Sequence, residues 1–279
     1  YNSKTYKHLK FGDGYQLYTR QDIQKEIYTS HVKPLACFIQ ISDLHVIDST
    51  SPSRAGFLGS LLPKLSQTFP SVKEDFASSF RPYEALSTQV IESMITRINK
   101  IKHGPITGMS VKCVVSTGDN CDSHQLNELR TYIDLLDGQV VYPNPTGETY
   151  MGIQDSSNQP NYEYFYHPDR APKNTLPDIY KRKYKYPNYQ NLLNCSCKPF
   201  QASGLDVPWY TCNGNLDSMI LGTYSCQDEM IQEVINRFST GKLEQLGSCM
   251  IQDMSEEQIF SFLDCLENKN VDGMINILN

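Results

Sequence analysis

Three short apolar runs, each followed at once by polar residues that can bind a metal, constrain the fold of this chain more than any other feature. The runs have the length of strands and cover residues 35–41, 111–117 and 207–212. A continuous apolar run of this length is typical of a strand that is covered on both faces in a parallel sheet. Ligands of such sheets bind beyond the carboxyl ends of the strands. The polar residues that follow each run are therefore the first candidates for a functional site.

Helical patterns separate these runs. Apolar residues recur every three or four positions through residues 86–101, and Gly104-Pro105 would stop that helix. A second helix is predicted from Leu126 to Leu136 and is closed by Gly138. Strands that alternate with helices predict βαβ units. We therefore expect an α/β fold with a mostly parallel sheet.

The pattern divides the chain into an N-terminal arm, a domain that contains the strands, and a helical C-terminal tail. These parts are residues 1–34, 35–226 and 227–279, respectively. The domain is expected to carry two long insertions, at about 48–80 and 142–200, and the many aromatic residues of the second should order it. In the tail, Ser255 and Gln258 are spaced as a capping box that opens a helix.

Charge and hydropathy exclude two classes of partner. The net charge is −6, which disfavours binding of nucleic acid, because that binding depends on basic residues that neutralise phosphates. The basic run 181–186 is therefore interpreted as a solvated loop of the second insertion. The apolar runs are too short to span a bilayer, so we expect no membrane span. The chain has nine cysteines, which is an odd number, and the sequence leaves open whether Cys195, Cys197, Cys212 and Cys226 form disulfides. The cellular compartment therefore also stays open, and secretion is one of the alternatives.

The polar residues after the three runs have the chemistry of a metal site. Asp43 and His45 are two residues apart at the end of an extended segment, so their side chains should point the same way. Asp119 follows Gly118, and a carboxylate has two oxygens that can bridge two ions. Asn215 could add a neutral carbonyl oxygen. Mixed nitrogen and oxygen ligands without thiolate suit zinc, manganese or iron.

With these residues in this order, the chain resembles the calcineurin-like metallophosphoesterase superfamily. The opening motifs of that superfamily are Asp-x-His, Gly-Asp-x-x-Asp/Glu and Gly-Asn-His-Asp/Glu. A narrower resemblance, to a long-insert bacterial branch, covers about residues 35–226 and is carried by short stretches of sequence. These stretches are 40–45 with 51–54, 116–120 with 127–129 and 136–138, and 204–210.

The resemblance implies the first half of the calcineurin-like fold and a two-metal hydrolase that acts on phosphate esters. Asp43 and His45 would hold the first ion, Asp119 would bridge, and Asn215 would bind the second ion. Asp122 would support these ligands without touching an ion. A metal-bound hydroxide would attack the phosphate ester.

Two departures from the family pattern weaken the expectation of activity. Leu216 stands where the family has the histidine that assists the leaving group, and a general acid typically contributes about 10²- to 10⁴-fold. The family also takes metal-binding histidines from a second half, whereas the last histidine here is His167. We therefore expect at most one divalent ion and assign no catalytic residue.

Three functions follow from these observations. The first is a metallophosphoesterase-like protein with an incomplete dinuclear site, impaired in hydrolysis, that acts as a binding or structural module. The alternative is an active phosphoesterase, either because one ion suffices or because a further segment or partner chain completes it. A third is an assembly component that uses its helical tail. The expected partners are accordingly a phosphate-ester ligand at the metal site and a protein partner at the tail.

Overall fold

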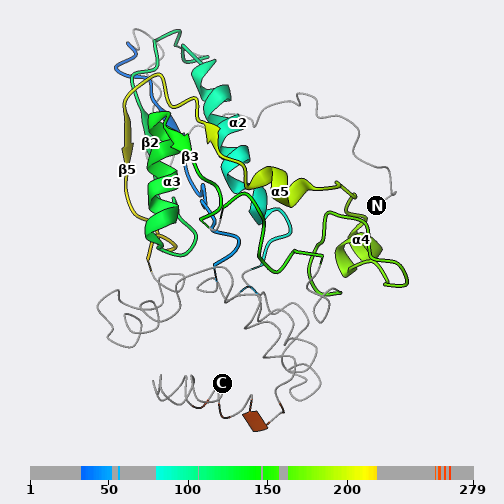
Figure 1. The fold of residues 1–279 in the computed structure, drawn as a ribbon. Coiled ribbons are helices and arrows are strands. Elements are labelled where there is room, and N and C mark those ends of the chain that lie inside the picture. The colour runs from blue at the N-terminus through cyan, green and yellow to red at the C-terminus, as the bar shows by residue number, and fades with distance from the viewer. Residues whose placement is uncertain are drawn as a thin grey trace, which may run out of the picture.

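A computed structural model describes residues 33–51, 56, 80–105, 107–145, 147–156 and 163–218, with 255, 257–258, 261 and 264 (Figure 1). Most of the N-terminal arm, residues 52–55 and 57–79 of the first insertion, Cys226 and most of the helical tail lie outside these residues. The elements are β1 (Ile39–Ile41), η3 (Glu84–Leu86), α2 (Ser87–Asn99), β2 (Val114–Ser116), α3 (Leu126–Asp137), β3 (Val140–Val141), α4 (Ile179–Tyr184), α5 (Leu192–Ser196), β4 (Phe200–Gln201) and β5 (Trp209–Thr211).

The main sheet is parallel, and its three strands have the order β1-β2-β5. These are the three strands that precede the polar motifs, so the prediction of an α/β fold with neighbouring parallel strands is confirmed. A crossover that contains α2 joins β1 to β2, and α3 follows β2. The strands β3 and β4 form a separate antiparallel pair.

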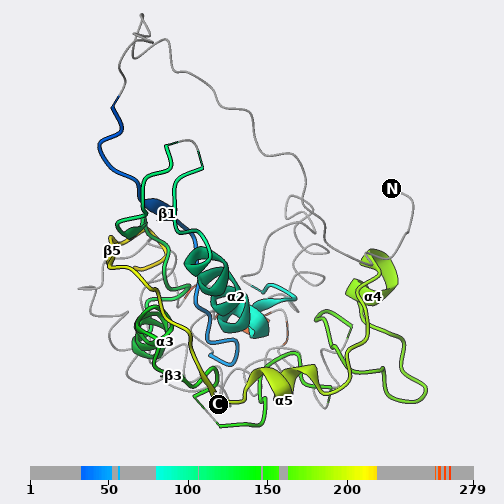
Figure 2. The same ribbon diagram turned by 90° about the horizontal axis from the view of Figure 1, so that it is seen from above.

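One face of the sheet packs on α2 and α3, which lie side by side next to the strands (Figures 1 and 2). Ile41 and Val114 turn to this face and are 8% and 0% exposed. The paired residues Gln40, Val115 and Tyr210 lie on the other face, where Tyr210 is 62% exposed and Gln40 is also exposed. The expectation that the runs are covered on both faces is therefore wrong for the described residues. An apolar run records that a strand is hydrophobic, but the arrangement of helices decides which face is covered.

The two long helices form where the periodicity predicts them. In α2, Ile91, Ile95 and Ile98 are buried, and Val90 on the opposite side is 61% exposed. The predicted close of α3 is confirmed at Gly138, which has a left-handed φ of 71°. A Cβ at Gly138 would lie 3.2 Å from the backbone of Gly204. Glycine is thus required there both for its φ and for this close approach.

The second insertion is ordered by aromatic packing, as expected. Phe80 makes edge-to-face contacts with Phe165 and Tyr180, with ring centroids 5.1 and 5.7 Å apart, and Tyr166 packs on Tyr186 at 5.0 Å. The expectation of a solvated loop at residues 181–186 is wrong, because most of this run belongs to α4. The Asp178 side chain caps that helix by accepting the Lys181 N–H, at 3.0 Å.

Three further expectations can be compared with the structure. The Ser255 N–H donates to Gln258 Oε1 (2.8 Å) and the Gln258 N–H donates to Ser255 Oγ (3.2 Å), which confirms the capping box. The six cysteines of the described part, Cys195, Cys197 and Cys212 among them, are free thiols. Within the same residues, the structure contains no helix that is long and apolar enough to cross a membrane.

Candidate metal centre

The loops that follow β1 and β2 run side by side and are held together by backbone hydrogen bonds. The Asp43 N–H donates to the Gly118 carbonyl (3.0 Å), the His45 N–H to the Asp119 carbonyl (3.0 Å), and the Val46 N–H to the Asn120 carbonyl (2.9 Å). These bonds continue the pairing of the parallel strands past the end of the sheet. They place the first and second polar motifs next to each other.

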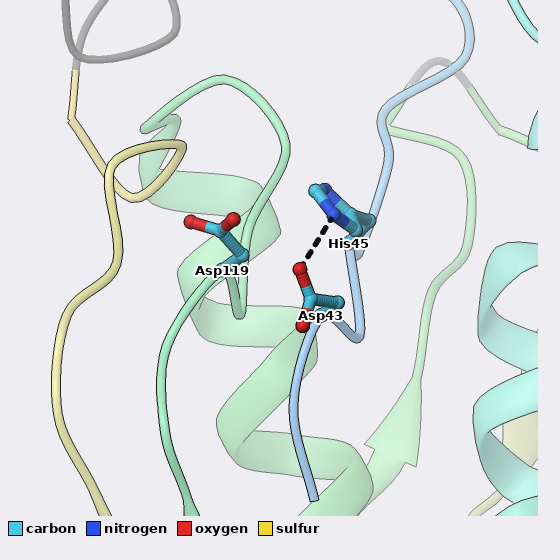
Figure 3. A group of neighbouring side chains, drawn as sticks. All are labelled: Asp43, His45 and Asp119. Carbon is cyan, nitrogen blue, oxygen red and sulfur yellow. Dashed lines mark ion pairs between the residues drawn. The ribbon is translucent and has the colours of Figure 1, made fainter.

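Asp43, His45 and Asp119 converge at this edge of the sheet (Figure 3). Each offers one ligand atom, and these atoms lie within 4.8 Å of one another. Two ligands at about 2.2 Å from one ion can be at most about 4.4 Å apart, so a small side-chain rotation would bring all three into coordination. The Asp43 side chain is 63% exposed and the His45 side chain is 29% exposed. The group is therefore open to solvent on the side of Asp43.

All three of these residues have a left-handed backbone. Their φ angles are 57° at Asp43, 46° at His45 and 52° at Asp119. The expectation that Asp43 and His45 point the same way because the segment is extended is therefore wrong; the turned backbone brings them together instead. Left-handed non-glycine residues cost of order 1–3 kcal/mol each and cluster at functional sites, where the surrounding structure holds them.

His45 is oriented by a second carboxylate. Its Nδ1 lies 3.2 Å from Asp122 Oδ1, and its Nε2 lies 3.8 Å from Asp43 Oδ1, the pair marked in Figure 3. The Asp122 carboxylate beside Nδ1 raises the pKa of His45, burial opposes this, and the negative charges of Asp119 and Asp43 add to the rise. In neutral His45 a proton on Nδ1, held by Asp122, would leave the Nε2 lone pair facing the ligand group.

The loop after β5 packs tightly against Asp119. The Leu216 N–H donates to Asp119 Oδ1 at 2.8 Å. A Cβ at Gly214 would lie 2.2 Å from Asp119 Oδ1 and 2.4 Å from the Asp119 backbone nitrogen. Asn215 lies between these two residues on the same loop, and it is exposed. The structure thus places the third motif against the second, with Leu216 bound to Asp119 through its backbone.

Asp217 braces this arrangement, a role that the sequence did not reveal. Its side chain is buried and accepts the N–H groups of Asn120 (2.9 Å), Cys121 (2.7 Å) and Gly214 (2.8 Å). The Asn120 side chain also donates to it, at 3.0 Å. One carboxylate therefore ties the second loop to the third. The sequence feature that could have indicated this role is that an acidic residue, Asp217 itself, ends the third motif.

Glu128 is a second brace that was missed. Its buried carboxylate accepts the N–H groups of Asp48 (3.0 Å) and Ser123 (2.9 Å). Asn127 donates to Asp48 Oδ2 at 2.7 Å, so the start of α3 holds both loops that carry the candidate ligands. Its position in the capping box of α3, three residues after Gln125, was the signal that could have found it.

The donor set can bind a divalent ion. Two carboxylates and one imidazole match the nitrogen and oxygen ligands preferred by zinc, manganese and iron, and the three together leave further coordination positions open. Comparisons of the chain with protein-family models, with curated proteins and with solved structures find no match. The functional assignment therefore depends on the geometry of this group.

Proposed function

We propose that this protein is a metallophosphoesterase-like module that binds one divalent ion through Asp43, His45 and Asp119. The observation that carries the proposal is the convergence of these three ligand atoms within 4.8 Å at the carboxyl edge of a parallel sheet. The left-handed backbone at all three residues adds support, since such conformations persist where the surroundings enforce them.

The calcineurin-like fold is the finer part of the proposal. It is supported by the order of the three motifs along the chain and by the order β1-β2-β5 of the strands that precede them. Asp122 also lies against His45, where the family resemblance expects a supporting group. A carboxylate behind a metal-binding histidine is a common arrangement because it fixes the tautomer and the orientation of the ring.

Asp43, His45 and Asp119 would hold the single ion, most readily manganese, zinc or iron. When bound there, such an ion would polarise a phosphoryl oxygen and lower the pKa of a water molecule. The candidate ligand that the sequence offers for a second ion is Asn215, which is exposed and lies between Gly214 and Leu216 on the loop that contacts Asp119. Leu216 contributes a backbone N–H to Asp119 but no side-chain acid for a leaving group. We therefore propose that phosphate-ester hydrolysis is impaired.

The test is a titration of the metal-free protein with Mn²⁺ or Zn²⁺. We expect one tight site per chain, lost or weakened at least tenfold by Asp119→Asn. Asp206→Asn is the matched control because it removes the same charge from an exposed residue that pairs with Lys102 (2.6 Å) instead. Equal binding by the two variants, or two tight ions per chain, would contradict the proposal.

The alternative function is an active metal-dependent phosphoesterase, and the open side of the site favours it. Three protein ligands with a free position are the composition of catalytic zinc sites, and the Asp43 side chain is 63% exposed. Hydrolysis of p-nitrophenyl phosphate and bis-p-nitrophenyl phosphate decides between the two functions. We expect the parent to be near background. Robust turnover that Asp119→Asn abolishes would instead establish the active enzyme, and a silent Leu216→His variant would show that more than this acid is missing.

A further inference from the structure

An open pocket of about 380 Å³ lies beside α4, and four of the eight residues that line it are basic. Figures 1 and 2 both show α4 apart from the main sheet. The side chains that define the cavity come from the loop before α4, from α4 itself and from the segment after it. The charged and polar ones are Arg170, Lys181, Arg182, Lys185, Tyr186 and Asn188, and Ala171 and Pro177 complete the lining.

The charge of this region is opposite to that of the whole protein. Residues 163–190 contain six Lys and Arg against three Asp and Glu, in a chain whose net charge is −6. The three acidic residues do not line the cavity. A cavity lined by charges of one sign concentrates the field and raises the local concentration of ions of the opposite sign.

Lys181 is the most buried of these cations. Its side chain is 7% exposed, its Nζ donates to the Asp169 carbonyl, and it lies 3.7 Å from a carboxylate oxygen of the fully buried Asp178. Burial lowers the pKa of the Lys181 ammonium group, and the nearby acidic residues offset this only in part. A negative charge in the cavity would therefore stabilise this ammonium group further.

The other cations are weakly neutralised by their neighbours. Arg182 lies 3.7 Å from Glu163, but both side chains are largely exposed, and exposed pairs contribute little. Lys185 donates from Nζ to the Arg182 carbonyl at 2.9 Å, which leaves its charge uncompensated by that contact. Arg170 is exposed and also lines the cavity. Lys181 and Arg182 thus have acidic partners, whereas the described part of the chain contains no ion pair of Arg170 or Lys185, which supply the positive charge available to a ligand.

We propose that this cavity binds the phosphate group of a small phosphorylated molecule. The Arg170 and Arg182 guanidinium groups can each donate two parallel hydrogen bonds to a phosphate, and Lys181 and Lys185 add ammonium charges. Tyr186 and Asn188 are further polar residues on the wall. The volume lies within the range of small-molecule sites and exceeds that of a bare phosphate, so the pocket has room for an organic substituent on the phosphate. This site is separate from the proposed metal centre in its residues and its chemistry.

The first test is calorimetric titration of the full chain with phenyl phosphate and with inorganic phosphate. A chelator and a constant ionic strength keep metal and bulk charge from contributing. We expect saturable binding, tighter for phenyl phosphate, and weakened about 10-fold by Arg170→Gln or Lys185→Gln, because each removes a charge-assisted hydrogen bond. Both residues are exposed, so the variants should fold, and circular dichroism checks this.

Lys183→Gln is the matched control. Lys183 is on the same helix and carries the same charge, but it lies over the Tyr184 ring and does not line the cavity. We expect its affinity to stay within about twofold of the parent. An equal loss in Lys183→Gln, or no saturable binding by the parent, would overturn the proposal and leave a charged surface only.

Two further arms identify the source of the anion. Sulfate should compete with inorganic phosphate if the site recognises any tetrahedral dianion. Phenyl phosphate should bind more tightly than sulfate if the organic substituent contributes to the affinity. Two macromolecular probes are used, phosphatidylserine-containing vesicles and, separately, a single-stranded oligonucleotide. A small-molecule pocket would be refuted if either probe bound more tightly than phenyl phosphate and if this binding were lost equally in Arg170→Gln, Lys185→Gln and Lys183→Gln. Binding should persist in Asp119→Asn, which separates this proposal from that of the metal centre.

Discussion

Gly214→Ala should damage the candidate metal centre without removing any ligand. The new Cβ would lie 2.2 Å from Asp119 Oδ1 and 2.4 Å from the Asp119 backbone nitrogen, more than 1 Å inside the ordinary contact distance. Rotation of the Asp119 side chain relieves only the first of these overlaps, so the loops after β2 and β5 must separate. Overpacking of this kind typically costs about 1–3 kcal/mol of stability.

The separation of the loops should displace the Asp119 carboxylate far enough to disturb its coordination of an ion. We expect the affinity for Mn²⁺ to fall at least tenfold, measured by titration of the metal-free protein, together with a lower melting temperature. Gly104→Ala is the control, because its Cβ would lie 2.8 Å from Cys37 Sγ and touches none of the ligands. It should lower the melting temperature and leave the affinity unchanged. A Gly214→Ala protein that binds Mn²⁺ as tightly as the parent would refute the reasoning.

Three more predictions test the bracing, the core and the thiols. Asp122→Asn should weaken Mn²⁺ binding about 10- to 100-fold, because it removes the carboxylate behind His45, one of the proposed ligands; an unchanged titration would contradict that role. Ile95→Ala should lower the free energy of unfolding in urea by about 2–5 kcal/mol, whereas Val90→Ala, at an exposed position, should change it by about 0.5 kcal/mol or less. Similar losses of unfolding free energy in the two variants would show that the buried face of α2 is misassigned. Burial raises the pKa of Cys197 to about 11, so its alkylation should be slow at pH 8 and should accelerate as the pH rises toward 11. The exposed Cys195 should be labelled at once. Mass spectrometry after a short pulse of alkylating reagent compares the two thiols.

The elements that could be predicted from the sequence are those that depend on local patterns. The spacing of Ile91, Ile95 and Ile98 predicts α2, and Gly138 predicts the end of α3, because periodicity and a left-handed cap are encoded within a few residues. The formation of α4 could not be predicted from its basic composition. It depends on the cap at Asp178 and on Tyr180, which packs against Phe80 about a hundred positions earlier in the chain.

The identity of the candidate ligands could be predicted, but the way they meet could not. Residue type singles out Asp43, His45 and Asp119, whereas alternation along an extended strand gives the wrong reason for their convergence. Their φ angles of 57°, 46° and 52° are set by hydrogen bonds to a loop more than seventy residues away. The bracing by Asp217 was missed for the same reason, since two of its partners, Asn120 and Cys121, belong to another motif.

The packing of the core also determines the geometry of the site. The register pairs Ile41 with Ser116, and the backbone hydrogen bonds of Asp43 and His45 to the next loop continue from that pairing. A slip of one residue would turn Ile41 to the open face and bury Gln40, because side chains alternate along a strand. The same slip would move Asp43 and His45 one position along the loop that carries Asp119. Burial of the apolar face of β1 therefore excludes the one-residue slips that would move Asp43 and His45 away from their observed positions beside Asp119.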